Sequence, residues 1–334
     1  MTATLKAPFP YFGGKSRVAA AIWERFGRVD NFVEPFFGSG AVLLGCPWPG
    51  HTETVNDADG LLANFWRALR ADPDAVAEHA DYPVSELDLH ARHRWLVAQR
   101  ADVERLLAEP DWYDAKAAGW WVWGISQWIG GGWCDGRMSV RLPHVGAGWR
   151  GTEKGEGVHR ESLHRKSFGK LPSIGATGFG ESGEKGVHLQ TALTAYLRAL
   201  SERLRRTRVT CGDFERVLGP SVTWRHGLTA VLLDPPYDRA ERVDVYAVET
   251  DAAHRAQAWA IENGNNPLLR IALCGYDSIE MPAGWRMVRW KAAGGYGSQG
   301  EGRGRENAAR EVVWFSPHCL DLDALPLFAG MEAA

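Results

Sequence analysis

Four consecutive residues, Asp234-Pro235-Pro236-Tyr237, are the best suited to chemistry, and they follow an aliphatic run over residues 229–233. A buried strand that ends in this way presents a carboxylate, a rigid turn and a flat ring at one place. The Asp234 carboxylate and the Pro235 carbonyl can each accept one N–H of an amine, which localises the nitrogen lone pair. The motif therefore predicts chemistry on a planar, weakly nucleophilic amine, such as that of adenine or cytosine, with Tyr237 stacked on an extruded base.

A purely structural interpretation of these four residues is the alternative. They could form the turn that closes a buried strand, with Asp234 capping the segment that follows. A catalytic role needs a cofactor site as its partner.

A Gly-rich turn near the N-terminus supplies a candidate for that site. Residues 31–35 predict a strand that runs into Phe36-Phe37-Gly38-Ser39-Gly40 and the start of a helix. The two glycines allow a ligand close to the backbone, and Glu34 offers a carboxylate to a cationic amino group. Asp57 ends the next strand, about twenty residues on, where this architecture places an acid on ribose hydroxyls. Because the full GxGxxG of a dinucleotide site is missing, a ligand with an ammonium group, a ribose and no phosphate fits better, and S-adenosylmethionine has those parts.

A second phosphate-binding pattern, at Gly14-Lys15-Ser16, resembles the end of a P-loop. The pattern GxxxxGK[ST] requires glycine at position 9, where this chain has Phe9, and no strand precedes it. We therefore set the NTPase interpretation aside. Lys15 could be a solvated loop lysine, but its glycine neighbours favour an approach to a ligand.

The composition limits the class of protein. The chain has 334 residues, 45% of them hydrophobic, which indicates one large domain with an insertion, or two domains. Five scattered cysteines without a CxxC pair, and the lack of a signal-like or membrane-length segment, predict a reduced, soluble, cytoplasmic protein without membrane contact or metal site. Since the net charge is -3, any contact with nucleic acid must come from a local basic patch.

Helices and strands alternate at both ends of the chain. Amphipathic helices are predicted over residues 16–26, 61–69 and 189–204, and the apolar residues 113–128 predict a buried helix. Strands are predicted over residues 31–35, 53–55, 208–211, 229–233, 268–274, 285–290 and 311–315. The pattern indicates an α/β protein with a Rossmann-like, doubly wound sheet. We expect residues 1–71 and 188–318 to form the catalytic domain, residues 72–187 an insertion, and residues 319–334 a C-terminal tail.

The insertion is first helical and then rich in Gly, Ser and His. Between residues 136 and 170 it carries eight Lys or Arg against three Glu. Such a basic segment in a mildly acidic chain favours contact with nucleic acid, although a solvated loop is the alternative. The candidates for that contact are Arg137, Arg141, Arg150 and Lys166. Several of the 16 tryptophans lie between residues 112 and 149, where we expect core packing rather than stacking surfaces.

In their order, these motifs resemble those of the Dam-like, alpha-class DNA adenine-N6 methyltransferases, a family with a DPPY motif. The similar segments are residues 8–15, residues 32–40, Asn56-Asp57, Gly212-Asp213-Phe214, residues 234–237 and residues 310–314. The resemblance implies that S-adenosylmethionine donates a methyl group to the 6-amino group of adenine in DNA. We expect direct in-line transfer on a flipped base, without a covalent enzyme intermediate.

The resemblance also implies the roles of particular residues. The catalytic candidates are Asp234, Pro235 and Tyr237, and the cofactor candidates are Tyr11, Lys15, Glu34, Phe36, Gly38, Gly40, Asp57, Asp213 and Asp234. Residues 72–187 would be the target-recognition domain, DNA the substrate, and a cognate restriction endonuclease of a restriction-modification system a candidate partner. We expect a monomer or a weak dimer. The family's polar recognition hairpin is replaced here by tryptophans and glycines, which leaves the target sequence and the duplex preference open.

Two alternative functions stay open at this point. Related tetrapeptides serve methyl transfer to the cytosine 4-amino group, to RNA adenine and to protein glutamine, and only Asp234 and the motif order favour adenine in DNA. The other alternative is a non-catalytic DNA-binding descendant, against which the intact acceptors, ring and cofactor acids argue.

Overall fold

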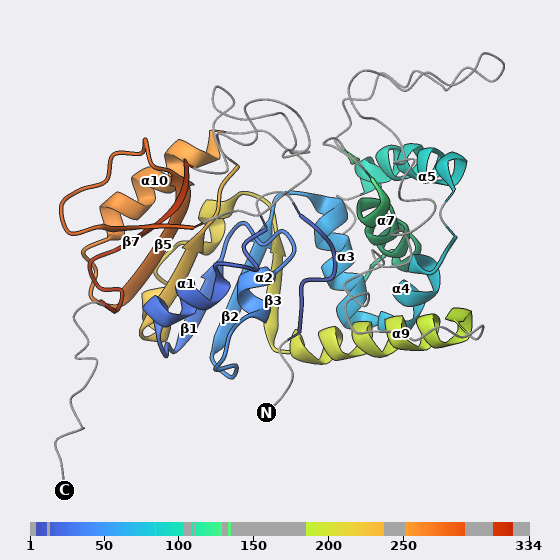
Figure 1. Cartoon of the computed structure of the whole chain (residues 1–334), viewed down its shortest axis with the longest axis horizontal. Coiled ribbons are helices and arrows are strands. Elements are labelled where there is room, and N and C mark those ends of the chain that lie inside the picture. The colour runs from blue at the N-terminus through green and yellow to red at the C-terminus, as the bar shows by residue number, and fades with distance from the viewer. Residues whose placement is uncertain are drawn as a thin grey trace, which may run out of the picture.

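A mixed seven-stranded sheet forms the centre of the molecule, with the strand order β3-β2-β1-β4-β5-β7-β6 (Figure 1). The computed structural model describes residues 5–11, 14–83, 85–102, 109, 111–128, 133–134, 185–236, 251–290 and 310–322. The strands are β1 (Asn31–Glu34), β2 (Thr52–Asp57), β3 (Thr207–Cys211), β4 (Thr229–Leu233), β5 (Leu269–Tyr276), β6 (Arg286–Arg289) and β7 (Glu311–Phe315). All residues of β1 and β4 are buried, as the continuous apolar run of a central parallel strand requires.

The order in which the chain adds strands to the sheet reverses between β1 and β4. These two strands pair in parallel, and the chain proceeds from β1 to β2 and β3 on one side and from β4 to β5 on the other. Strand β7 runs antiparallel between β5 and β6. Ligands of doubly wound sheets bind outside the carboxyl ends of the strands at such a switch point. The predicted Rossmann-like α/β class is therefore confirmed.

Helices cover the sheet and extend beyond β3. They are α1 (Ala19–Phe26), α2 (Ala41–Leu44), α3 (Gly60–Ala71), α4 (Pro73–Ala80), α5 (Glu86–Ala98), α7 (Ala115–Gln127), α9 (Lys185–Arg203) and α10 (Ala252–Asn263), with 3-10 turns η1 (Gln99–Asp102), η3 (Phe214–Val217) and η4 (Trp224–His226). In Figure 1, α4, α5, α7 and α9 gather at one end of the molecule, and α10 lies at the other end with β5 and β7. None of the described helices is long and apolar enough to span a membrane.

The first helix begins later than the sequence indicated. Residues 16–18 form a turn, in which the carbonyl of Lys15 accepts the N–H groups of Val18 and Ala19, and α1 starts at Ala19. The other predicted elements are present with shifts of a few residues at their ends. Helix α10 was not predicted.

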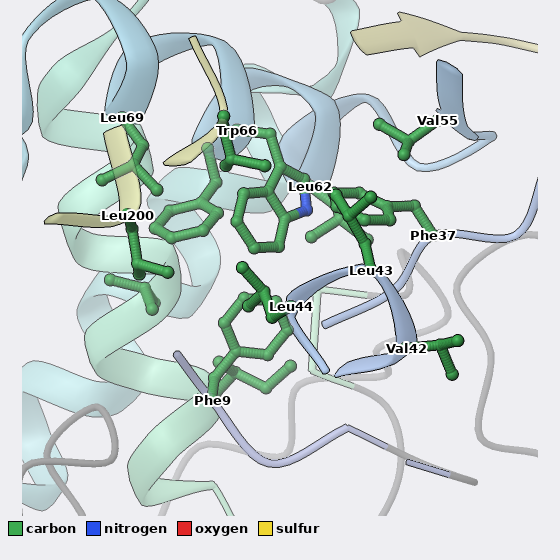
Figure 2. Packing of buried hydrophobic residues seen from close by; sticks show 14 of the residues in the cluster. Phe9, Phe37, Val42, Leu43, Leu44, Val55, Leu62, Trp66, Leu69 and Leu200 are labelled. Atoms are coloured by element: carbon green, nitrogen blue, oxygen red, sulfur yellow. The ribbon is translucent and has the colours of Figure 1, made fainter. Parts of the chain in front are cut away.

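Two hydrophobic clusters fill the two faces of the sheet, since neighbouring residues of a strand point to opposite sides. The first contains Phe32 and Leu232 and includes residues of α1, α2, α3, α7 and α9. Figure 2 shows part of it, with Phe9 among the labelled side chains. The Phe9 ring packs edge-on against Phe65 and Trp121. This contact anchors the N-terminal loop, which carries Lys15 towards the sheet.

The tryptophans of the insertion are mainly core residues, as expected. Trp121, Trp123, Trp128 and Trp133 are all buried. The indole N–H of Trp133 donates to the carbonyl of Trp121, and that of Trp123 donates to the carbonyl of Tyr82. The candidate DNA contacts Arg137, Arg141, Arg150 and Lys166 and the Gly-rich loop over residues 294–304 lie outside the described residues.

Candidate active site

A pocket opens at the carboxyl ends of β1 and β4, where the switch point lies. Among the residues that line it are eight of the predicted cofactor and catalytic candidates: Tyr11, Lys15, Glu34, Phe36, Gly38, Asp57, Asp213 and Asp234. Three other candidates are not among the lining residues. Gly40 and Pro235 do not contribute to this lining, whereas Pro236 does, and Tyr237 lies outside the described residues.

The Gly-rich turn after β1 is fixed by Asp57. One oxygen of the Asp57 carboxylate accepts the N–H of Gly38 at 3.0 Å, and the other accepts the N–H of Asp59 at 2.9 Å. Gly38 has a positive φ of 49°, and a Cβ there would lie 2.8 Å from the Tyr11 ring. The turn therefore needs glycine at position 38, both for its backbone conformation and for the close approach of the ring.

Gly40 serves the conformation of the same turn rather than the lining of the pocket. Its φ is 68°, and a Cβ would lie 2.8 Å from the ring of Phe37. It also precedes the first residue of α2. Among the described residues, Gly40 therefore acts through the shape of the backbone.

Asn56 ties three strand ends together, a role that the sequence analysis did not assign. Its amide group donates to the carbonyls of Pro35 at 3.1 Å and Gly212 at 2.9 Å, and its oxygen accepts the hydroxyl of Thr210. Asn56 is buried, so these partners satisfy an amide that would otherwise be costly to bury. In the sequence, an amide side chain directly before Asp57 was the feature that could have indicated this role.

Lys15 forms an ion pair with the catalytic candidate Asp234. Its Nζ lies 2.8 Å from Oδ1 of Asp234 and 5.5 Å from the centre of the Trp290 ring. Lys15 is 3% exposed, while 22% of the Asp234 side chain is exposed, on the wall of the pocket. The two residues come from the N-terminal loop and from the end of β4, and the ion pair joins them in the folded chain.

Glu34 is a buried carboxylate whose charge is only partly balanced. Its Oε2 has no hydrogen-bond partner among the described residues. Burial, and then the nearby charge of Asp234, raise the pKa of Glu34 well above its usual value, although a backbone hydrogen bond from Leu43 opposes the shift. An acceptor of this kind on a pocket wall suits a cationic ligand, which would favour the ionised form.

Asp57 shows a similar but smaller effect. Burial raises the pKa of Asp57 to about 6, while the hydrogen bonds from Asp59 and Gly38 hold it down. The carboxylate is thus ionised at neutral pH and protonated in mild acid.

Glu311, the first residue of β7, also belongs to this group and was not singled out in the sequence. It pairs with Tyr276 at the end of β5, so it stands at the same edge of the sheet as Asp234. Burial raises the pKa of Glu311, the charge of Lys15 lowers it, and that of Asp234 raises it. In the sequence, a glutamate at the start of a buried strand was the feature that could have indicated Glu311. Only the pairing of β7 with β5 shows that it lies at the same edge of the sheet as Asp234.

One wall of the pocket is formed by Phe36, which follows β1, and by Asp213 and Phe214, which follow β3. The rings of Phe36 and Phe214 lie with their centres 4.9 Å apart at an angle of 31°. Asp213 directly precedes Phe214 and binds Arg255 of α10, with a nitrogen-oxygen distance of 3.1 Å. Flat apolar surfaces beside a fixed acceptor suit a heterocyclic ring with an amino group.

This sheet order, with acidic side chains and a Gly-rich turn at its switch point, defines a Rossmann-like methyltransferase fold. Residues 11–97 match the family described as D12 class N6 adenine-specific DNA methyltransferase. The match confirms the Dam-like resemblance and indicates an adenine-specific DNA methyltransferase enzyme. Methyltransferases of this kind generally use S-adenosylmethionine. A comparison with curated proteins finds none that matches this chain.

The matched segment covers only part of the pocket. It includes Lys15, Glu34 and Asp57, whereas Asp213 and Asp234 follow it in the sequence. The structure brings the two groups together around one pocket.

Proposed function

We propose that this enzyme moves a methyl group from S-adenosylmethionine to the 6-amino group of a flipped adenine in DNA. The observation that carries the proposal is the ion pair of 2.8 Å between Lys15 and Asp234, inside a pocket that is also lined by Glu34 and Asp57. It puts the acceptor for an amine next to the acidic groups expected for a cationic, ribose-containing cofactor.

The residues of the pocket fit this cofactor. Glu34 has an oxygen without a partner in the described part of the chain, which suits the ammonium group. Asp57 would accept the ribose hydroxyls, and Asp213 with the rings of Phe36 and Phe214 would receive the adenine end. When bound, S-adenosylmethionine supplies a methyl group that its sulfonium already activates.

The chain's own contribution to the chemistry is position and hydrogen-bond acceptance. The Asp234 carboxylate and the Pro235 carbonyl would each accept one N–H of the target amine, so that the nitrogen lone pair points at the methyl carbon. The sulfonium would supply the methyl group and leave as a neutral thioether, and Asp234 would take the proton that the amine loses. Tyr237 would stack on the flipped base. No covalent intermediate with the enzyme is needed.

DNA contact and partners complete the proposal. Residues 72–187 would recognise the target, with Arg137, Arg141, Arg150 and Lys166 on phosphates. Restriction-modification is typical of the family. A cognate restriction endonuclease as partner and a monomer or weak dimer as the working form remain predictions.

A labelling experiment tests the proposal. The protein is incubated with S-adenosylmethionine labelled in its methyl group and unmethylated duplex DNA, and the digested DNA is analysed for methylated nucleosides. We expect label in N6-methyladenine and none in a control duplex that contains only G and C. Label in methylcytosine, in RNA alone or in no nucleic acid would show the proposal to be wrong.

A further inference from the structure

Arg255, in the first turn of α10, makes a dense set of contacts beside the pocket. Its Nη1 and Nη2 donate to the two oxygens of Asp213, each at 3.1 Å, and its Nε donates to Glu215 at 2.8 Å. The centre of its guanidinium group also lies 5.0 Å from the centre of the Phe214 ring. Arg255 thus contacts three consecutive residues of the segment after β3.

That segment forms one wall of the pocket. Asp213 and Phe214 line it, and the Phe214 ring packs against Phe36, the first residue of the Gly-rich turn. Ala252, one helical turn before Arg255, lines the pocket as well. Helix α10 therefore reaches the pocket at two points, through Ala252 directly and through Arg255 by way of Asp213.

The contacts leave Asp213 with a defined orientation. An ionised carboxylate offers about four acceptor sites. Arg255 uses two of them, and the N–H of Glu215 shares Oδ1 at 3.0 Å. Because 45% of the Asp213 side chain is exposed, the carboxylate would rotate freely without these donors. The planar guanidinium fork fixes both oxygens at once, which the single ammonium group of a lysine cannot do.

A contribution to folding stability alone does not explain why Arg255 makes these contacts. Exposed ion pairs contribute about 0–1 kcal/mol to folding, because both side chains lose freedom and water screens the charges. Arg198 and Asp74 form such a pair between α9 and α4, in which Nε and Nη2 of Arg198 bind the two oxygens of Asp74, with high exposure and away from the pocket lining. What distinguishes Arg255 is that its partners line a binding site.

We infer that Arg255 is a positioning residue of the cofactor site, which holds Asp213 and Phe214 in the orientation that receives the adenine end of S-adenosylmethionine. The inference rests on the proposed function and adds to it a residue on α10. In this arrangement Asp213 accepts an N–H of the adenine amino group, and Phe214 supplies a flat surface for the ring.

The test compares Arg255→Met and Arg255→Lys with the wild-type enzyme. We expect Arg255→Met to bind S-adenosylmethionine about tenfold more weakly, the effect of losing one oriented hydrogen bond to a charged group. The KM for S-adenosylmethionine should rise to a similar extent, while kcat at saturating cofactor stays within about twofold, since Arg255 does not touch the methyl group. Arg255→Lys should recover only part of the affinity.

A cofactor analogue separates positioning from general damage. S-inosylmethionine carries an oxygen in place of the adenine amino group, so it offers Asp213 an acceptor instead of a donor. The wild-type enzyme should bind this analogue about tenfold or more weakly than S-adenosylmethionine, because the hydrogen bond to Asp213 is lost and two acceptors face each other. In Arg255→Met the ratio of the two dissociation constants should approach one. A residue with a purely structural role would change both constants equally.

Arg198→Met is the matched control, since it removes an equivalent two-point pair at another place. It should bind both ligands as the wild type does. Wild-type affinity in Arg255→Met, a loss confined to the melting temperature, or an undiminished preference for S-adenosylmethionine would overturn the inference while the proposed function stands. If the wild-type enzyme itself methylates adenine in DNA without binding S-adenosylmethionine, the proposed cofactor is wrong as well.

Discussion

Lys15 and Asp234 are more than two hundred positions apart in the sequence and lie 2.8 Å from each other in the fold. Lys15 is almost completely buried, and the acidic groups of Glu34, Asp234 and Glu311 surround the same edge of the sheet. Removal of one partner from a buried ion pair leaves a charge without compensation, which is costly. Lys15 is therefore expected to compensate the charge of Asp234 and to hold its carboxylate in place.

The first prediction concerns Lys15→Met. The variant loses the cation that lowers the pKa of Glu311, so protonation of that carboxyl group should begin at higher pH. Methyl transfer should fall by about a hundredfold or more, because the ion pair orients Asp234. The folded state should also lose stability, because Asp234 is left without its partner. Transfer rates and thermal unfolding measure the two effects. Lys6→Met, an exposed residue of the same loop, is the control and should behave as wild type; an equal loss in both variants would contradict the prediction.

The second prediction separates binding from chemistry at Asp234. Asp234→Ala should retain measurable binding of S-adenosylmethionine, because Glu34, Asp57 and Asp213 remain. Methyl transfer should drop by about 10²–10³-fold, as when one preorganised group is removed from an active site. Calorimetry and single-turnover assays measure the two quantities. Full activity in this variant would remove the mechanism proposed for Asp234.

The central strands and the acidic residues at their ends could be predicted because the physical rule is local. A buried parallel strand is a continuous apolar run, and residues 229–233 form one. Carboxyl ends of parallel strands share one edge of the sheet, so Glu34, Asp57 and Asp234 were expected to lie close together. The ion pair of Asp234 with Lys15 depends on how a loop folds back over the edge, which no local pattern specifies.

Two elements escaped prediction for different reasons. Helix α10 buries Ala252, Ala256 and Ala260, and alanine gives too weak an apolar signal to mark a helix face. Glu311 was placed in a strand, but its approach to Lys15 requires β7 to enter the sheet between β5 and β6. Long-range contacts of this kind follow from the topology rather than from the spacing of residues.

The third prediction concerns the pH dependence of cofactor binding through Asp57. Burial raises the pKa of Asp57 to about 6, so the carboxylate loses its charge below that pH. Affinity for S-adenosylmethionine should fall as the pH drops through about 6, because a protonated acid accepts ribose hydroxyls poorly. The effect on stability has the opposite sign. A folded-state pKa above the usual 3.8 contributes stability at low pH, and this contribution is lost as the pH rises through about 6.

Asp57→Asn tests both effects. Titrations between pH 5 and pH 8 should show weaker binding in the variant at neutral pH and a flatter dependence on pH than in the wild type. Unfolding measured over the same range should lose the part of the pH dependence that Asp57 contributes. An unchanged slope of affinity against pH would assign the titration to another group.

The fourth prediction is proton release when the cofactor binds. Burial and the charge of Asp234 raise the pKa of Glu34 well above its usual value. An ammonium group beside this carboxyl group would favour the ionised form, so binding should release protons to the solvent between the usual and the raised pKa. Calorimetry in two buffers of different ionisation enthalpy counts these protons. Glu34→Gln should bind more weakly and release fewer protons, and equal release in both proteins would contradict the assignment.

The fifth prediction concerns the packing of helix α7 at Gly124. A Cβ at position 124 would overlap the indole ring of Trp133, which is buried and hydrogen-bonded to Trp121. Gly124→Ala should therefore lower the free energy of unfolding by about 1–3 kcal/mol, the usual cost of overpacking a core. Gly219→Ala is the matched control, because a Cβ at Gly219 would meet no heavy atom within 4 Å. That variant should stay within about 0.5 kcal/mol of wild type in urea titrations, and equal stability of the two variants would show that Trp133 does not pack against α7 in solution.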